Sequence, residues 1–428
     1  KKICHENITE FNDLIEQSFS NNNKSSFFYL TPSFSRNTLN SPIFHYFITA
    51  KFIEKYKNDI LKYNTIFVDN YIHKDYIKFH LIKNNIKKKY IYKVKDNLFT
   101  LIIKIIFLNF LQCIKEIINR TIIYLISRLT LFFFEKIKLI GQIILIDRYV
   151  FPKYVYTDRY YNNLDKYIKK NQNIKFVPTL EYFKLSNFYN TYKTLRLSKN
   201  YIIKDDYITL IDLFKCYFKC FSLFKINILK IENYKIDYLI KLDILKLSNY
   251  IHPLIEGHIT LLFIKNLKKE DINITTTINW YENNIKDKCW NIGFKDNFKK
   301  VKTKGYLGFF PYHLFLNISS PSKYEEKLNI LPSTICVIGD KIIDIISKGL
   351  EVTKIETAPA FRFFYLFNIK LKQDLSYNRK SVLISLPILR HESDKIFQDV
   401  YKICNEFPNT RFYLMPHPTN IVYSKKYI

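Results

Sequence analysis

The sequence predicts an α/β protein of two domains, each built around a parallel β-sheet. At 428 residues the chain is longer than one ordinary hydrophobic core requires. Short apolar segments rich in β-branched and aromatic residues alternate with segments of helical spacing, an order that favours parallel strands joined by helices. A polar stretch rich in Ser and Pro, SSPSKYEEKLNILPS at 319–333, separates two such series. We therefore expect domains at 1–320 and 321–428.

The first series begins with strands separated by short helices and ends in a longer helical region. Its predicted strands lie at 25–32, 66–70, 90–94, 143–150, 174–180, 272–283 and 301–309. Helical spacing is found at 44–56 and through most of 185–270. Within that last region, Asp205 and Asp206 are expected to cap a helix that begins near Tyr207.

The second series repeats the β–α–β pattern. It has predicted strands at 335–340, 352–359, 381–388 and 411–415 and a helix at 391–407. The last strand runs into MPHPTN at 415–420, where neither proline can donate a backbone hydrogen bond and both fix φ. This phrase predicts a stiff loop that holds one imidazole, His417, or else a plain turn that ends a strand.

Residues 98–146 are the most apolar part of the chain, and a helical insertion is expected at about 98–140. Lys104, Arg120 and Arg128 interrupt it, so it does not resemble an uncharged membrane span. A pair of helices buried between domains is the first interpretation. The alternatives are a pair lying in a membrane interface, served by the lysines of 83–95, and a true span.

The chain is strongly basic, with 67 Lys and Arg against 38 Asp and Glu and a net charge of +29. Codon bias toward A and T accounts for much of this excess, and no zinc-finger spacing, aromatic RNA-binding motif or Arg-rich arm is present. A nucleic-acid partner would rest on charge alone and is not expected. Anionic partners such as sugar nucleotides, and the inner leaflet of a membrane, suit the charge better.

Seven cysteines without a CxxC pair indicate a reduced, cytoplasmic chain, and a peripheral position at the inner face of the plasma membrane is compatible with this expectation. The sequence lacks a Walker A loop, GxGxxG, GxSxG and HExxH. The usual dinucleotide-binding, hydrolase and zinc-protease classes are therefore disfavoured.

An ordered series of phrases resembles bacterial surface-polysaccharide and capsule glycosyltransferases. These phrases are VYTDRYY (155–161), FVPTL (176–180), NWYENNIKDKCWNIGF (279–294), TKGYLGF (303–309), PSKYEEKLNILPSTICVIGD (321–340), ETAPAFRF (356–363), LISLPI (383–388) and MPHPTN (415–420). The resemblance covers roughly residues 140 to 428 and is specific as a series, whereas each phrase alone is weak.

This resemblance implies the GT-B architecture, two Rossmann-like domains facing a cleft, with the second domain binding the nucleotide donor. The His-Pro motif is shared with Kdo transferases, polysialyltransferases and CDP-polyol transferases, so a cytidine-linked donor is the first expectation. By resemblance, His417 contacts the donor phosphates, with Thr419 beside it. No cofactor or metal is implied, which fits the missing DxD motif. Only eight residues follow Asn420, so the donor domain looks incomplete and the chain resembles a fragment.

Glu282 in WYEN is the candidate catalytic base, because a partly desolvated carboxylate beside Trp280 and Tyr281 can take a proton from a sugar hydroxyl. Alternatively, Glu282 caps the helix that starts near Asn284. Arg362 could pair with a donor phosphate or a sugar carboxylate, or it could be a surface arginine.

Asp158 and Arg159 follow a strand, at the edge where open α/β sheets bind ligands. They could contact substrate, or pair with each other and hold the loop.

The predicted function is transfer of a sugar from a nucleotide-activated donor to a growing surface glycan or lipid-linked acceptor. The alternative is a non-catalytic, scaffold-like member of a polysaccharide assembly at the inner membrane.

Overall fold

The computed structural model forms two compact units, Lys1–Phe364 and Tyr365–Ile428. It describes residues 2–18, 26–68, 71–86, 91–92, 98–152, 155, 158, 160–162, 164–167, 173–181, 183–226, 228–231, 233–348, 350–368, 380–387 and 390–416.

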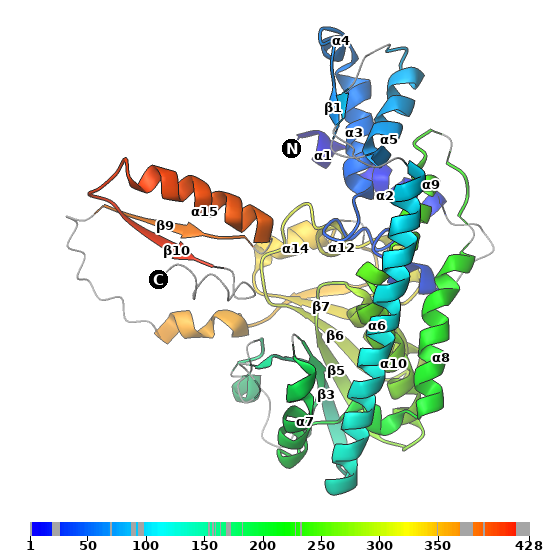
Figure 1. Ribbon diagram of the computed structural model, residues 1–428. Coiled ribbons are helices and arrows are strands. Elements are labelled where there is room, and N and C mark those ends of the chain that lie inside the picture. Colours follow the sequence, from blue (N-terminus) through cyan, green and yellow to red (C-terminus); the bar gives the residue numbers. More distant parts are fainter. Residues whose placement is uncertain are drawn as a thin grey trace. The chain divides into compact units, whose positions relative to one another are not determined.

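A six-stranded, all-parallel sheet is the centre of the first unit (Figure 1). Its strands are β3 (Gln142–Val150), β4 (Asn173–Leu180), β5 (Asn273–Trp280), β6 (Lys302–Leu307), β7 (Thr334–Val337) and β8 (Lys354–Thr357). Their order in the sheet is β4-β3-β5-β6-β7-β8. The α/β prediction is confirmed as a Rossmann-like parallel sheet, and each of these strands lies where its apolar run predicted it.

The sheet continues across residue 320, where the sequence placed the domain boundary. Strands β7 and β8, assigned from the sequence to the second series, pair with β6 in this sheet. The Ser- and Pro-rich stretch lies in the connection from β6 to β7, which carries the short helices α12 (Leu316–Ser319) and α13 (Lys323–Lys327). Its polar side chains Ser319, Ser322 and Glu325 are buried, so they belong to an internal hydrogen-bond network.

The described residues also form two smaller parallel strand pairs. In the first unit, β1 (Phe67–Val68) pairs with β2 (Ile91–Tyr92). In the second unit, β9 (Ser381–Ser385) pairs with β10 (Arg411–Met415), and α15 (Arg390–Cys404) connects them. All four were predicted, although β1 and β2 are shorter than expected.

The strand predicted at 25–32 is wrong, because these residues form the 3-10 helix η1 (Ser26–Leu30) followed by turns. The hydroxyls of Thr31 and Ser35 donate to main-chain carbonyls three residues earlier, which stabilises turns over an extended chain. This curled segment buries Phe28, Leu30 and Phe34 in the helical core.

Helices surround the sheet and form a second apolar core. The longer ones are α2 (Ile8–Gln17), α3 (Ile43–Lys55), α5 (Tyr71–Lys83), α6 (Leu98–Phe133), α7 (Phe188–Leu197), α8 (Leu210–Phe221), α9 (Ile236–Leu245), α10 (Ile251–Lys268) and α11 (Ile285–Asn297). The shorter ones are α1 (Lys2–Glu6), α4 (Lys57–Leu61), α14 (Asp340–Ile346), η3 (Leu164–Tyr167), η4 (Leu185–Asn187), η5 (Lys204–Tyr207), η6 (Ser222–Lys225), η7 (Leu247–Asn249) and η8 (Phe361–Asn368).

Helices α10 and α11 pack against one face of the sheet and close against each other. Ile143 and Leu145 of β3 point to this face, where they meet Phe263 and Trp290, whereas Ile144 and Ile146 point to the opposite face. The close approach of the two helices requires small residues. A Cβ added at Gly293 would lie 2.6 Å from Ile264 Cδ1.

The apolar insertion is a single helix, α6, and the prediction of two buried helices is wrong. Residues 98–133 contain no Gly or Pro to end the helix. One side of α6 is buried at Cys113, Tyr124 and Thr130, whereas large apolar side chains on the other side are exposed. Among the described residues, no helix combines the length and apolar character needed to cross a membrane.

Asp205 and Asp206 do not cap a helix, because they lie within η5 and α8 begins at Leu210. The N-cap of α8 is Thr209, in a reciprocal capping box with Asp212. Asp205 accepts a hydrogen bond from Arg120 Nη2 at 2.5 Å, and Asp206 accepts two from Arg196 at 2.7 Å each. Their carboxylates balance buried arginines.

Candidate functional site

The order of strands places a topological switch between β3 and β5. From β3 the chain moves outward to β4 on one side, and it returns to the other side of β3 as β5. The loops that leave the carboxyl ends of β3 and β5 therefore diverge, which is where open α/β sheets bind ligands. The first loop carries Asp158 and the second carries Glu282.

Glu282 is held at this edge by three hydrogen bonds. The indole Nε1–H of Trp280 donates to its Oε1 at 2.8 Å. Its own main-chain N–H donates to Asp287 Oδ2 at 2.8 Å, and its carbonyl oxygen accepts from Asn317 Nδ2 at 2.8 Å. Both the backbone and the carboxylate of Glu282 are thereby fixed, while the residue stays partly accessible.

The helix-capping alternative for Glu282 is wrong. The N-cap of α11 is Asn284, whose Oδ1 accepts from the N–H groups of Lys286 and Asp287 at 3.0 and 3.3 Å. Asp287 completes the capping box by accepting the Asn284 N–H. The carboxylate of Glu282 is therefore not used by the helix terminus.

The pKa of the Glu282 carboxyl lies above that of an ordinary Glu. Burial raises the pKa of the Glu282 carboxyl, and Glu181 raises it further, against the opposing effects of the Trp280 N–H, Arg362 and Lys286. A carboxyl with a raised pKa is the kind of group that can exchange a proton at moderate pH.

Arg362 and the loop after β3 meet at the same edge. The guanidinium of Arg362 lies 5.7 Å from the ring centre of Tyr160 and 6.0 Å from that of Trp280. The rings of Tyr160 and Trp280 are 4.0 Å apart. The fold thus brings together three segments that the sequence singled out, at 155–161, 279–294 and 356–363.

Asp158 holds the loop after β3. Its Oδ1 accepts from the N–H groups of Tyr160 and Tyr161, both at 2.8 Å, and its Oδ2 pairs with Arg148 Nε at 3.2 Å. These contacts give Asp158 a positioning role for Tyr160. Arg159, predicted beside it, lies outside the described residues.

A group of charged side chains around the ends of β3 and β4 was not predicted from the sequence. Asp147 accepts from Thr179 Oγ1 at 2.7 Å, and burial raises the pKa of its carboxyl. Lys286 forms an ion pair with Glu181 at the end of β4. The only signal for Asp147 was a charged residue inside the apolar run IILIDRYV.

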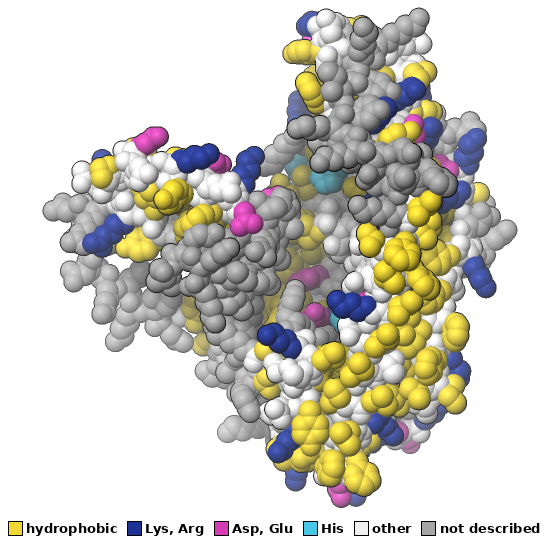
Figure 2. Space-filling model, in the orientation of Figure 1, with side chains coloured by type: hydrophobic (Ala, Val, Ile, Leu, Met, Phe, Trp, Pro, Cys, Tyr) yellow, Lys and Arg dark blue, Asp and Glu magenta, His cyan; other side chains and the backbone are white. Residues whose placement is uncertain are grey.

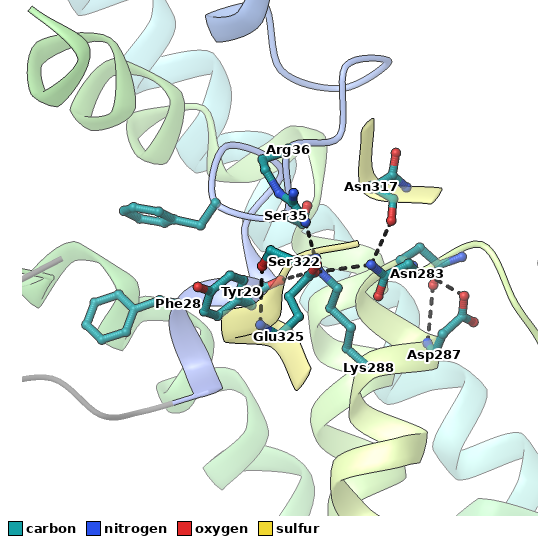
Figure 3. Close-up of polar contacts among 12 residues, drawn as sticks. Phe28, Tyr29, Ser35, Arg36, Asn283, Asp287, Lys288, Asn317, Ser322 and Glu325 are labelled. Atoms are coloured by element: carbon teal, nitrogen blue, oxygen red, sulfur yellow. Dashed lines mark hydrogen bonds and ion pairs between the residues drawn. The ribbon is translucent and has the colours of Figure 1, made fainter. Parts of the chain in front are cut away.

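A buried cluster behind the WYEN loop was also missed (Figure 3). Glu325 is fully buried and pairs with Arg36 and, at 2.8 Å, with Lys288 Nζ. Asn283 Nδ2 donates to Glu325 Oε1 at 3.1 Å and to the carbonyl oxygen of Asn317 at 2.7 Å. We call these five residues the Glu325 cluster.

The Glu325 cluster fixes the main chain at Glu282 and Asn283. Asn283, the next residue, adopts a positive φ of 51° that few side chains other than Gly and Asn accept readily. Asn317 holds the Glu282 carbonyl. Because Arg36 and Glu325 come from distant parts of the chain, the cluster couples the position of Glu282 to the folding of the whole first unit.

His417 and Thr419 lie outside the described residues, so their roles toward a donor stay predictions. The preceding strand β10 and Pro416 are described. Within the described part of the chain, no group of three or more His, Cys, Asp or Glu side chains is arranged to hold a metal ion.

Comparison with known proteins adds no relative. No family model matches the chain, and neither a curated protein nor a solved structure matches it.

Proposed function

We propose that this protein transfers a sugar from a nucleotide-activated donor to a glycan or lipid-linked hydroxyl acceptor. The observation that carries the proposal is the setting of Glu282. A carboxylate with a raised pKa is fixed at the topological switch of a parallel sheet, with the Arg362 guanidinium nearby. The resemblance to capsule glycosyltransferases points to the same residues.

In the proposed reaction Glu282 is the general base. The acceptor hydroxyl oxygen attacks the anomeric carbon, its proton passes to the Glu282 carboxylate, and the bond between that carbon and the donor phosphate oxygen breaks. The nucleotide leaves with the electron pair of that bond. The hydrogen bond from the Trp280 N–H lowers the pKa of Glu282 and so partly offsets the effect of burial. It stabilises the carboxylate form before that form accepts the proton.

Arg362 has the charge and position to pair with the departing phosphate. A guanidinium can present two N–H donors to phosphate oxygens, which stabilises the negative charge that develops as the nucleotide leaves. Its stacking near Tyr160 and Trp280 limits the orientations of the guanidinium. His417 is the second proposed phosphate ligand, on the grounds of the resemblance.

A panel of CMP, CDP, UDP and GDP tests the proposal by thermal unfolding. We expect a cytidine nucleotide to stabilise the wild-type protein by about 2.7 kcal/mol at a hundredfold excess over its Kd. Replacing Arg362 with Ala removes a charge-assisted contact worth about 1.5–3 kcal/mol, so affinity should fall at least about tenfold. His417→Ala should weaken binding likewise.

Arg128→Ala is the matched control, because Arg128 is an exposed arginine on α6. It should bind nucleotide as the wild type does. Equal affinity of the wild-type, Arg362→Ala and His417→Ala proteins for every nucleotide would contradict the proposed site. Absence of protection by any nucleotide would favour the non-catalytic scaffold.

A further inference from the structure

The outward sides of α6 and α8 carry large exposed apolar side chains. On α6 they extend from Ile103 to Phe133 and include Phe107, which is 60% exposed, and Phe132, which is 84% exposed. On α8 they extend from Leu210 to Phe218, with Ile211 67% and Phe218 75% exposed. We call these exposed side chains the apolar face.

The two helices lie side by side, so the apolar face is continuous. Thr121 Oγ1 of α6 lies 2.9 Å from the Tyr217 hydroxyl of α8, and the Tyr124 hydroxyl donates to the Ile208 carbonyl at 3.3 Å. Figure 2 shows apolar side chains as a long band over α6 and α8. Exposed patches of this extent mark interaction surfaces.

Several polar side chains of α6 point inward, among them the charged group of Arg120, whereas an ordinary surface helix turns such groups to solvent. Arg120 is buried and bonds to Asp205 and Glu256, each at 2.5 Å. Thr130 is buried and accepts from Arg196 Nε at 3.1 Å. Arg120, one of the three charged residues that interrupt the apolar run in the sequence, therefore does not interrupt the exposed apolar side of the helix.

The charges on these two helices favour an anionic lipid surface over a protein partner. Lys115 on α6 and Lys215 and Lys219 on α8 are exposed. Each helix has one carboxylate, and each of these already has a hydrogen-bond or ion-pair partner within the protein. Glu116 accepts from Gln112 and pairs with His252, whereas Asp212 belongs to the capping box. An apolar stripe edged by lysines is the pattern of helices that lie in a membrane interface.

The length of α6 supports the same orientation. Its 36 residues span about 54 Å, well beyond the roughly 30 Å of a bilayer's hydrocarbon core. Lying flat lets the whole helix place its apolar side among the acyl chains while its buried side stays packed on the protein.

We propose that the apolar face of α6 and α8 docks the protein onto the surface of an anionic lipid bilayer, without crossing it. This proposal does not rest on the proposed sugar transfer. It assigns membrane contact to a defined surface, whereas the sequence-based expectation relied on the lysines of 83–95, most of which lie outside the described residues.

Vesicle flotation with the full chain tests the proposal. The probes are vesicles of phosphatidylcholine alone and of phosphatidylcholine with phosphatidylglycerol. We expect strong binding to the anionic vesicles and weak binding to the neutral ones. The triple variant Ile211→Ser, Phe218→Ser and Phe132→Ser should bind the anionic vesicles at least about tenfold more weakly, because each lost side chain removes several buried carbons.

A second triple variant is the matched control. Leu39→Ser, Tyr63→Ser and Val352→Ser replace apolar residues that are 67%, 66% and 82% exposed outside the apolar face. It should bind anionic vesicles as the wild type does. Since all six positions are exposed, both variants should keep the wild-type unfolding midpoint.

Three results would overturn the proposal. One is a wild-type protein that stays unbound with both kinds of vesicle. Another is equal binding by the wild type and the apolar-face variant. The third is concentration-dependent self-association in sedimentation that the apolar-face variant abolishes while vesicles bind neither protein, which would assign the face to a second copy of the chain.

Discussion

Replacing Glu282 with Gln should lower the rate of sugar transfer about 10²- to 10⁴-fold, the usual contribution of a general base. Gln is isosteric and its Oε1 can still accept the Trp280 N–H, so the loop should keep its structure. The wild-type rate should rise with pH through a pKa above that of an ordinary Glu, because the carboxylate must be unprotonated to act and burial raises its pKa.

Glu181→Gln is the control for this experiment. Glu181 lies at the end of β4, near enough to affect the pKa of Glu282, and pairs with Lys286. The Glu181→Gln protein should keep most of its transfer activity. If Glu181→Gln removes the activity and Glu282→Gln does not, then Glu181 and not Glu282 is the general base.

Replacing Glu325 with Gln should lower the free energy of unfolding of the first unit by about 3–5 kcal/mol, the usual effect of leaving a buried charge without its partner. The Arg36 guanidinium and the Lys288 ammonium share this carboxylate, and both side chains are buried. Burial lowers the pKa of Lys288, whereas Glu325 and, more weakly, Asp287 raise it. Removing the carboxylate charge therefore destabilises both cations.

Tryptophan fluorescence during urea unfolding measures this loss directly. The chain has two tryptophans, Trp280 and Trp290, and both are buried in the first unit. Glu351→Gln is the control, because its ion pair with Lys323 is more than half exposed on both sides. Such surface pairs contribute about 0–1 kcal/mol. Equal midpoints for the two variants would show that the Glu325 cluster does not stabilise the fold.

The strands could be predicted because each is a short apolar run bounded by polar or turn-forming residues. The pairing of the strands could not be predicted, because the alternation of apolar and polar residues within a strand does not show which strand lies beside it. This is why β7 and β8 were placed in a separate series, although they extend the first sheet. The polar stretch at 319–333 reinforced the error, because a buried polar network and an exposed linker have similar compositions.

The candidate site was predictable in part. Glu282, Arg362 and Asp158 were singled out because their phrases follow strands, and they lie at one edge of the sheet because parallel strands end there. The Glu325 cluster was missed because Arg36 and Glu325 are separated by 289 positions, and no local pattern joins them. The capping-box pattern of Ser322 and Glu325 predicts a helix start, and the same Glu also serves the buried cations.

The most direct test of the account follows Trp280 emission in a Trp290→Phe protein during nucleotide titration. Trp280 bonds to Glu282 and lies near Arg362, so it reports on this edge of the sheet. We expect a saturable change in emission with a cytidine nucleotide, weakened at least about tenfold by Arg362→Ala. The proposed site would be contradicted if nucleotides raise the unfolding temperature but leave Trp280 emission unchanged, because the nucleotide would then bind elsewhere.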